Sequence, residues 1–187
     1  SPSIPIGLNI KNAMIRQREN MVRKLLDRGL LRNAGLIEAL LQVPPERFMS
    51  KHDVEKMFHG DVLPPPVKGL PNTSLSLSLI VRGLEKLEPL EGEHLSDFGA
   101  VTGYVTALMS VLVGSQGRVT ALHPNGEYHI LKKQLGRYTN VEVLDRPGMF
   151  NLDLSDKVDG IWLNGALPFA PTSFRGMMTK NGRMVCF

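Results

Sequence analysis

The sequence predicts an α/β fold with a mostly parallel sheet. From Glu93 onward, short apolar runs typical of strands alternate with segments of helical periodicity. A glycine-containing turn, GAVTG at 99–103, follows the first of these strands and leads into a helix. Strands that alternate with helices form right-handed crossovers, which place the strands parallel. We therefore expect helices on both faces of one parallel sheet.

The composition is that of one compact domain. The chain has 187 residues, of which 42% are hydrophobic and 21% are charged. The longest apolar stretch, 105–113, is much shorter than the roughly 20 residues of a membrane-spanning helix. One cysteine excludes an intramolecular disulfide, and no cysteine or histidine cluster has zinc-site spacing, so we expect no metal site. Within the domain we distinguish an N-terminal helical region with a proline-rich loop, 1–73, from an α/β core, 74–187.

The N-terminal region predicts two helices between Asn12 and about Val43. Apolar residues recur at helical spacing around Val22 and again over 36–41. Gly29 is expected to end the first helix, and the two prolines at 44–45 the second. The following VLPPPVKGLPNTS, 62–74, cannot form regular structure, because each proline fixes φ and removes a donor.

The segment SLSLSLIV, 74–81, fits two structures. Its strict alternation favours a strand, whereas the spacing of the apolar residues that follow favours a helix. We favour a helix that begins near Ser74, with Asn72 or Thr73 as its cap.

The α/β core predicts five strands and three further helices. The strands cover 94–98, 118–123, 141–144, 160–163 and 183–187, and the helices cover 104–112, 126–135 and 172–178. In such folds ligands lie at the carboxyl ends of the strands, which is where the GAVTG turn is placed. Glycines at 99 and 103 permit positive φ and close approach of a ligand, although two glycines also occur at such junctions for packing alone.

A nucleotide site of this architecture needs an acid at the end of the second strand to hold the ribose hydroxyls. The sequence places His123 there instead. After the third strand, 146–148 offers the residues that would face the base.

Several stretches together resemble the protein-L-isoaspartate O-methyltransferase family. The segment MVRKLLDRGLL…GLIEALLQVPPERFMSKHDVEKMFHGDVLP, 21–64, is similar to the N-terminal part of these enzymes, and DFGAVTGY is similar to their first methyltransferase motif. GRVTALH, NVEVLDRPG, VDGIWLNGALPFAP and NGRMV fall where the later motifs fall, so the resemblance runs from about Met21 to the end.

The resemblance implies a class I S-adenosylmethionine-dependent methyltransferase fold, a Rossmann-like three-layer sandwich with an N-terminal helical extension. The family's sheet has seven strands, and RMVCF resembles the fifth. We therefore expect the C-terminal strands to be missing. Because an open apolar edge promotes aggregation, either the sequence is a fragment or a partner protein pairs with that edge.

The resemblance also assigns site residues. The position of the family's functional serine is held by Ser76, which makes it the candidate catalytic residue. Val101 stands in place of a central glycine, His123 in place of the ribose-binding acid, and Pro147 in place of an aspartate associated with the adenine. The candidate cofactor-binding positions are Asp97, Gly99, Ala100, Gly103, Tyr104, His123 and Pro147.

These departures lead us to expect weak or lost S-adenosylmethionine binding. Loss of one charge-assisted hydrogen bond costs about 1.5–3 kcal/mol, or roughly ten- to a hundredfold in affinity. The leading hypothesis is a catalytically inactive methyltransferase-like protein that acts as a structural or binding component of a larger assembly. The first alternative is an active isoaspartate methyltransferase with an altered cofactor pocket.

A second alternative is an RNA-binding module. The formal charge is +4, and basic residues gather in the N-terminal helices, although a solvated helix face gives the same pattern.

The first eighteen residues contain Lys11, Arg16 and Arg18 and no acid, and the chain starts without methionine. From this we expect an intracellular protein, with the mitochondrial matrix favoured over the cytoplasm and a mitochondrial ribosome or its assembly particle as the setting.

Overall fold

The computed structural model describes residues 6–59, 76–124, 126–145, 156–164 and 171–187. Its centre is a five-stranded sheet in the order β3-β2-β1-β4-β5, and every neighbouring pair is parallel. The strands are β1 (His94–Phe98), β2 (Arg118–Leu122), β3 (Val141–Val143), β4 (Val158–Leu163) and β5 (Met178–Cys186). The predicted parallel α/β fold is thereby confirmed.

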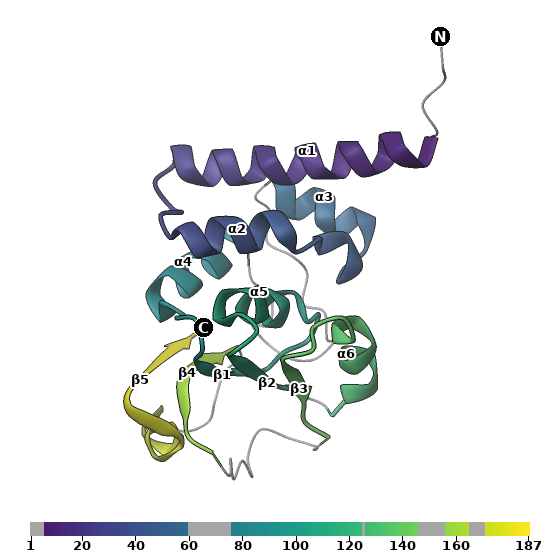
Figure 1. Ribbon diagram of the computed structural model, residues 1–187. Helices are drawn as coiled ribbons and strands as arrows, with labels where there is room; N and C mark the ends of the chain where they lie inside the picture. Colours follow the sequence, from purple (N-terminus) through teal and green to yellow (C-terminus); the bar gives the residue numbers. More distant parts are fainter. Residues whose placement is uncertain (1–5, 60–75, 125, 146–155, 165–170) are drawn as a thin grey trace.

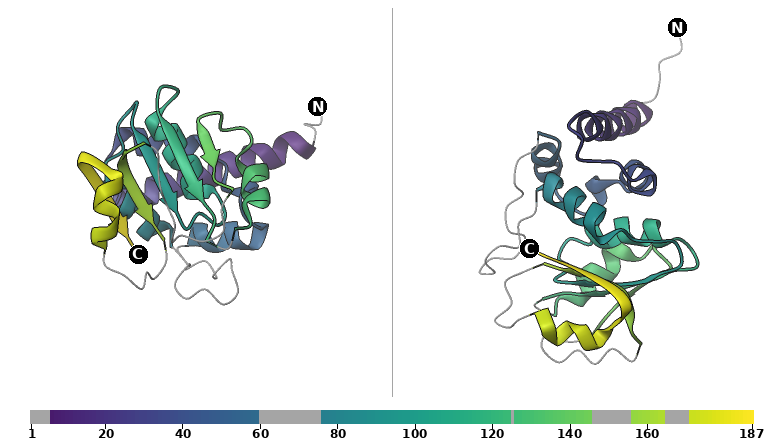
Figure 2. Two further views of the ribbon diagram at one scale, coloured as in Figure 1. Left: turned by 90° about the horizontal axis from the view of Figure 1, so that it is seen from below. Right: turned by 90° about the vertical axis from the view of Figure 1, so that its left-hand side faces the viewer.

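The described helices lie mostly on one face of the sheet (Figure 1). There α4 (Leu77–Leu87), α5 (Tyr104–Val113) and α6 (Tyr128–Leu135) form the layer next to the strands, and α1 (Ile6–Asp27), α2 (Ala34–Gln42) and α3 (Lys51–His59) lie beyond it. The short 3-10 turn η1 (Pro45–Arg47) links α2 to α3. On the opposite face lies η2 (Pro171–Met177), as the side view of Figure 2 shows.

The larger hydrophobic core joins the N-terminal helices to the α/β part. It holds Leu40 of α2, Leu84 of α4, Leu108 of α5 and Trp162 of β4, all at most 1% exposed. A smaller cluster on the other face contains Phe98, Ile161 and Phe174, whose packing holds η2 against the sheet.

Strand β5 is attached to the rest of the fold through Arg183. Its guanidinium donates to both carboxylate oxygens of Glu93, at 2.9 and 2.7 Å, and to the carbonyl oxygens of Leu87 and Glu88 at 2.8 and 3.1 Å. Such a two-pronged pair fixes geometry as well as charge. It connects β5 to the end of α4 and to the segment that precedes β1.

Several helix boundaries differ from those predicted from the sequence. The helix near 74–81 begins at Leu77 and is capped by Ser76, whose hydroxyl accepts from the Leu79 N–H at 3.2 Å, so the predicted cap at Asn72 or Thr73 is wrong. Ser76 lies three residues before Leu79, which is the usual spacing between an N-cap side chain and the main-chain N–H that it accepts from. The first helix begins at Ile6 instead of Asn12, and the helix Lys51–His59 was not predicted.

The predicted strand at 183–187 begins earlier, at Met178, and the strand at 160–163 begins at Val158. The predicted helix at 172–178 is present as a 3-10 helix, Pro171–Met177. Strand β5 pairs with β4 at Met178 and again from Arg183 to Cys186, and the register shifts between these two stretches.

Candidate functional site

The carboxyl end of β1 runs into a turn that depends on Gly99. This residue has φ of 93°, and a Cβ here would lie 2.1 Å from the carbonyl oxygen of Asn164. The Asn164 N–H donates to the Phe98 carbonyl at 2.8 Å, which holds the ends of β1 and β4 together. Only glycine fits both the φ and the close approach.

The second half of the turn starts α5. Gly103 is its N-cap with φ of 85°, and a Cβ there would lie 3.2 Å from the side chain of Leu135. Val101, between the two glycines, has no positive φ, because Glu88 is the one described non-glycine residue with that conformation. A β-branched residue therefore fits the turn without backbone strain. The N–H groups of Val101 and Gly103 donate to no acceptor in the described part of the chain.

Asp97 precedes the turn, and its carboxyl group is buried. The residue is 2% exposed and accepts a 2.6 Å hydrogen bond from the Thr106 hydroxyl of α5. Burial raises the pKa of Asp97 to about 7, and the hydrogen bond opposes this increase. Ala100 is buried too, at 4% exposed, and its N–H donates to the Leu122 carbonyl oxygen at 3.1 Å. Asp97 thus fixes α5 against β1.

The end of β2 carries His123 and Glu127 together. His123 is 3% exposed, and its Nδ1 accepts from the Glu127 N–H at 3.2 Å, while Nε2 lies 3.9 Å from a Glu127 carboxylate oxygen. Burial lowers the pKa of His123, and the charge of Glu127 raises it. The Glu127 side chain is 60% exposed. An accessible carboxylate therefore lies beside the position where the sequence placed only a histidine.

The end of β3 carries a second carboxylate. Asp145 accepts a hydrogen bond from the Tyr128 hydroxyl, and this bond raises the pKa of Tyr128. The predicted base-facing residue, Pro147, lies outside the described residues.

Two other predicted site residues have structural contacts. Ser76 is the N-cap of α4, so its hydroxyl accepts a main-chain hydrogen bond. Tyr104 is 1% exposed and packs on Phe48 with ring centroids 6.0 Å apart, and its hydroxyl has no hydrogen-bond partner among the described residues. Burial raises the pKa of Tyr104. The ring lies in the core between α5 and the N-terminal helices.

Sequence reasoning did not identify Thr106 or Glu127. Glu127 had a readable signal, since it stands four residues after His123, whereas the contact between Asp97 and Thr106 follows only from packing of α5 on β1. The assignment of cofactor and catalytic roles stays a prediction.

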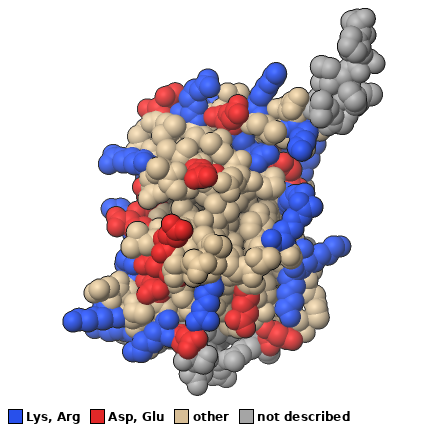
Figure 3. Space-filling model, in the orientation of Figure 1, with Lys and Arg blue, Asp and Glu red and all other residues tan. Residues whose placement is uncertain are grey.

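The basic N-terminal helices do not form a uniform positive surface on the face drawn in Figure 3. Acidic side chains alternate with basic ones over α1 there. No described helix is both long and apolar enough to cross a membrane. Across the same residues, no three His, Cys, Asp or Glu side chains gather in a metal-binding arrangement.

Known proteins with similar sequences are isoaspartate methyltransferases. Protein-L-isoaspartate O-methyltransferase of Methanococcus aeolicus is 28% identical over 177 residues, which cover 91% of this chain and 79% of that protein. The Methanococcus maripaludis enzyme is 27% identical over 165 residues, covering 87% and 76%.

Solved structures show the same fold. A protein-L-isoaspartate O-methyltransferase superposes with a TM-score of 0.75 at 22% identity, and the match covers 90% of this chain but only 54% of that one. A Plasmodium falciparum protein assigned as the same enzyme, in complex with S-adenosyl-L-homocysteine, gives a TM-score of 0.71 at 13% identity, covering 90% and 83%. The family model described as protein-L-isoaspartate(D-aspartate) O-methyltransferase matches residues 16–186. The chain therefore belongs to the protein-L-isoaspartate O-methyltransferase family, with the class I methyltransferase fold.

Proposed function

We propose that the protein is an S-adenosylmethionine-dependent carboxyl O-methyltransferase that acts on isoaspartyl residues and has an altered cofactor pocket. Membership of the family supports this function, since the similar proteins of both Methanococcus species carry the name of that enzyme. It replaces the inactive assembly component as the leading hypothesis.

The observation that carries the proposal is the accessible carboxylate of Glu127. His123 takes the place of the ribose-binding acid, but its Nδ1 accepts the Glu127 N–H and so holds Glu127 beside it at the carboxyl end of β2. Glu127 supplies a carboxylate acceptor at the strand end where this architecture holds ribose hydroxyls. We infer that Glu127 takes the role of that acid, four residues further along the chain.

The turn also fits the cofactor. Its two glycines have positive φ. The N–H groups of Val101 and Gly103, which donate to no acceptor among the described residues, are available as donors for a carboxylate such as that of the methionine moiety. S-adenosylmethionine supplies an electrophilic methyl group when bound. This chain's contribution is to hold the nucleoside through Glu127 and the methionine carboxylate through the turn.

Calorimetric titration with S-adenosylhomocysteine tests the proposal, together with methyl transfer to an isoaspartyl peptide and to its aspartyl counterpart. We expect saturable binding and transfer to the isoaspartyl peptide alone. Glu127→Gln should weaken binding about threefold to tenfold, below the full value of a charge-assisted hydrogen bond because the side chain is exposed.

The matched control is Glu91→Gln, which removes the same charge from an exposed residue. Glu91 precedes β1 and therefore lies at the amino ends of the strands, whereas Glu127 lies at their carboxyl ends. It should leave the affinity unchanged. No binding by the unaltered protein would overturn the proposed function, whereas equal affinity of the Glu127→Gln variant would overturn only the role of Glu127.

A non-catalytic binding role is the second candidate. It is favoured by the hydrogen bonds of Ser76, Asp97 and His123, each of which accepts from a donor of the chain itself. Binding of S-adenosylhomocysteine without any methyl transfer would favour this role. A mitochondrial setting, ribosomal assembly, a protein at the edge of β5 and RNA binding stay predictions.

A further inference from the structure

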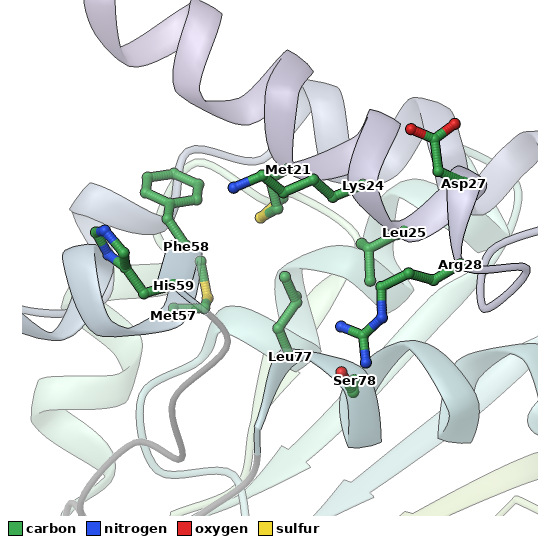
Figure 4. A pocket seen from close by; sticks show the side chains of 10 residues that line it. All are labelled: Met21, Lys24, Leu25, Asp27, Arg28, Met57, Phe58, His59, Leu77 and Ser78. Atoms are coloured by element: carbon green, nitrogen blue, oxygen red, sulfur yellow. The ribbon is translucent and has the colours of Figure 1, made fainter.

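A cavity of about 240 Å³ opens between α1, α3 and the start of α4 (Figure 4). Its floor is apolar and belongs to the main core, with Met21 and Leu25 of α1, Met57 of α3 and Leu77 of α4. This volume lies below the usual 300–1,000 Å³ of drug-sized ligand pockets. It suits one or two side chains of a bound peptide better than a nucleotide.

Two cations lie at the mouth of this cavity. Figure 4 shows the Lys24 ammonium extending over the opening toward Phe58, and the Arg28 guanidinium reaching down toward Ser78. Asp27 carries its carboxylate away from both of them. Neither Lys24 nor Arg28 forms an ion pair anywhere in the described part of the chain. The mouth is therefore positively charged above an apolar floor.

We propose that this cavity binds an acidic peptide segment that places an apolar side chain on the floor and a carboxylate between Lys24 and Arg28. Both side chains are long and exposed, so each can follow the carboxylate while its aliphatic stem covers the apolar residue. Burying that residue on Met21, Leu25 and Met57 supplies the non-polar contribution to binding. The site is separate from the cofactor turn and does not depend on methyl transfer.

The shape of the site favours a peptide over RNA. RNA binding of this kind needs a continuous basic groove with aromatic platforms for several bases. Here two cations flank one cavity with an apolar floor, and the aromatic rings among the described lining residues, those of Phe58 and His59, are neighbours at the end of α3. A carboxylate next to a leucine or phenylalanine matches both parts of the site.

The test measures fluorescence anisotropy with labelled hexapeptides and no cofactor. The probe is Gly-Glu-Leu-Glu-Phe-Gly, and its counterparts replace both glutamates by glutamine or both apolar residues by serine. We expect the probe to bind at least about threefold more tightly than either counterpart. The double variant Lys24→Gln with Arg28→Gln should weaken binding of the probe by a similar or larger factor. Ser78→Phe, which partly fills the cavity without changing charge, should also weaken it.

The matched control is Arg16→Gln with Arg23→Gln, which removes two exposed cations from the same helix outside the cavity. It should bind the probe within twofold of the unaltered protein. Equal losses in both double variants, or equal affinity for the three peptides, would overturn the proposal, as would absence of binding. Preferred binding of labelled oligouridylate with a steep salt dependence would assign the cations to RNA instead. Melting temperatures of all variants check that each is folded.

Discussion

At the scale of single residues, Asp97 illustrates how a motif residue acquires a structural role. Its carboxyl group is enclosed between β1 and α5, where Thr106 donates to it, and burial raises its pKa from 3.8 to about 7. The ionised form is thus disfavoured in the folded protein relative to the unfolded chain. The same residue fixes the start of the turn that we propose to bind the cofactor.

This pKa predicts a pH-dependent stability. Between about pH 4 and 7 the unfolded chain has lost the proton that folded Asp97 still binds, so the free energy of unfolding should fall as pH rises through this window. The change levels off above pH 7 and amounts to at most about 4 kcal/mol. Asp97→Asn, which keeps an acceptor for Thr106, should lack this contribution.

Urea denaturation of both proteins at pH 4, 5.5, 7 and 8 measures the contribution of Asp97. It is the difference between their free energies of unfolding at each pH, in which the contributions of the other titrating groups cancel. The stability of Asp97→Asn relative to the unaltered protein should increase toward pH 7. A difference that is constant with pH would contradict the assigned pKa.

At the scale of elements, the contact of α4 with the sheet requires a glycine. A Cβ on Gly83 would lie 2.5 Å from two ring carbons of Trp162 and 2.6 Å from the ring of Phe187. These two rings pack on each other with centroids 4.9 Å apart, so α4, β4 and the end of β5 meet at this point.

Gly83→Ala should therefore lower the free energy of unfolding by about 1–3 kcal/mol, the usual cost of overpacking, although alanine is the better helix former. Gly136→Ala is the control, since a Cβ there lies 3.5 Å from its nearest atom and φ is −59°. It should be neutral or stabilising by up to about 1 kcal/mol. Equal thermal shifts of the two variants would refute the packing argument.

At the scale of the whole molecule, one core joins the N-terminal helices to the α/β part. Leu40 of α2 and Trp162 of β4 belong to the same cluster of buried residues, and Glu85 of α4 accepts from the main-chain N–H groups of Arg32 and Asn33 at 2.7 and 2.8 Å. We expect the regions 1–73 and 74–187 to unfold together.

Leu40→Ala should lower stability by about 2–5 kcal/mol, and the fluorescence of Trp162, the single tryptophan, should report the same shift as far-UV circular dichroism. Leu41→Ala on the same helix changes a side chain that is 38% exposed and should have a much smaller effect. If Leu40→Ala leaves the unfolding transition seen by Trp162 fluorescence unchanged, the regions 1–73 and 74–187 unfold as two independent units.

The sequence determined the fold class, the five strands and the position of the turn, because strand and helix periods and glycine spacing are local properties. The family resemblance likewise depended on local motifs, and the match over 16–186 confirmed it. The cap at Ser76 went unrecognised because neighbouring polar side chains compete for this role, and the early start of β5 because it depends on the pairing of Met178 with Val158 of β4.

Only the tertiary structure decided how the side chains of the site are used. Asp97 meets Thr106 because α5 packs on β1, and Val101 fits the turn because its φ is not positive. Glu127 becomes a candidate cofactor ligand because buried His123 holds it at the end of β2. Lys24 and Arg28 become candidate ligands of an acidic peptide because α1, α3 and α4 enclose a cavity between them. Most of these contacts depend on how separate elements pack on one another, which periodicity along the chain does not record, whereas the spacing of His123 and Glu127 is visible in the sequence.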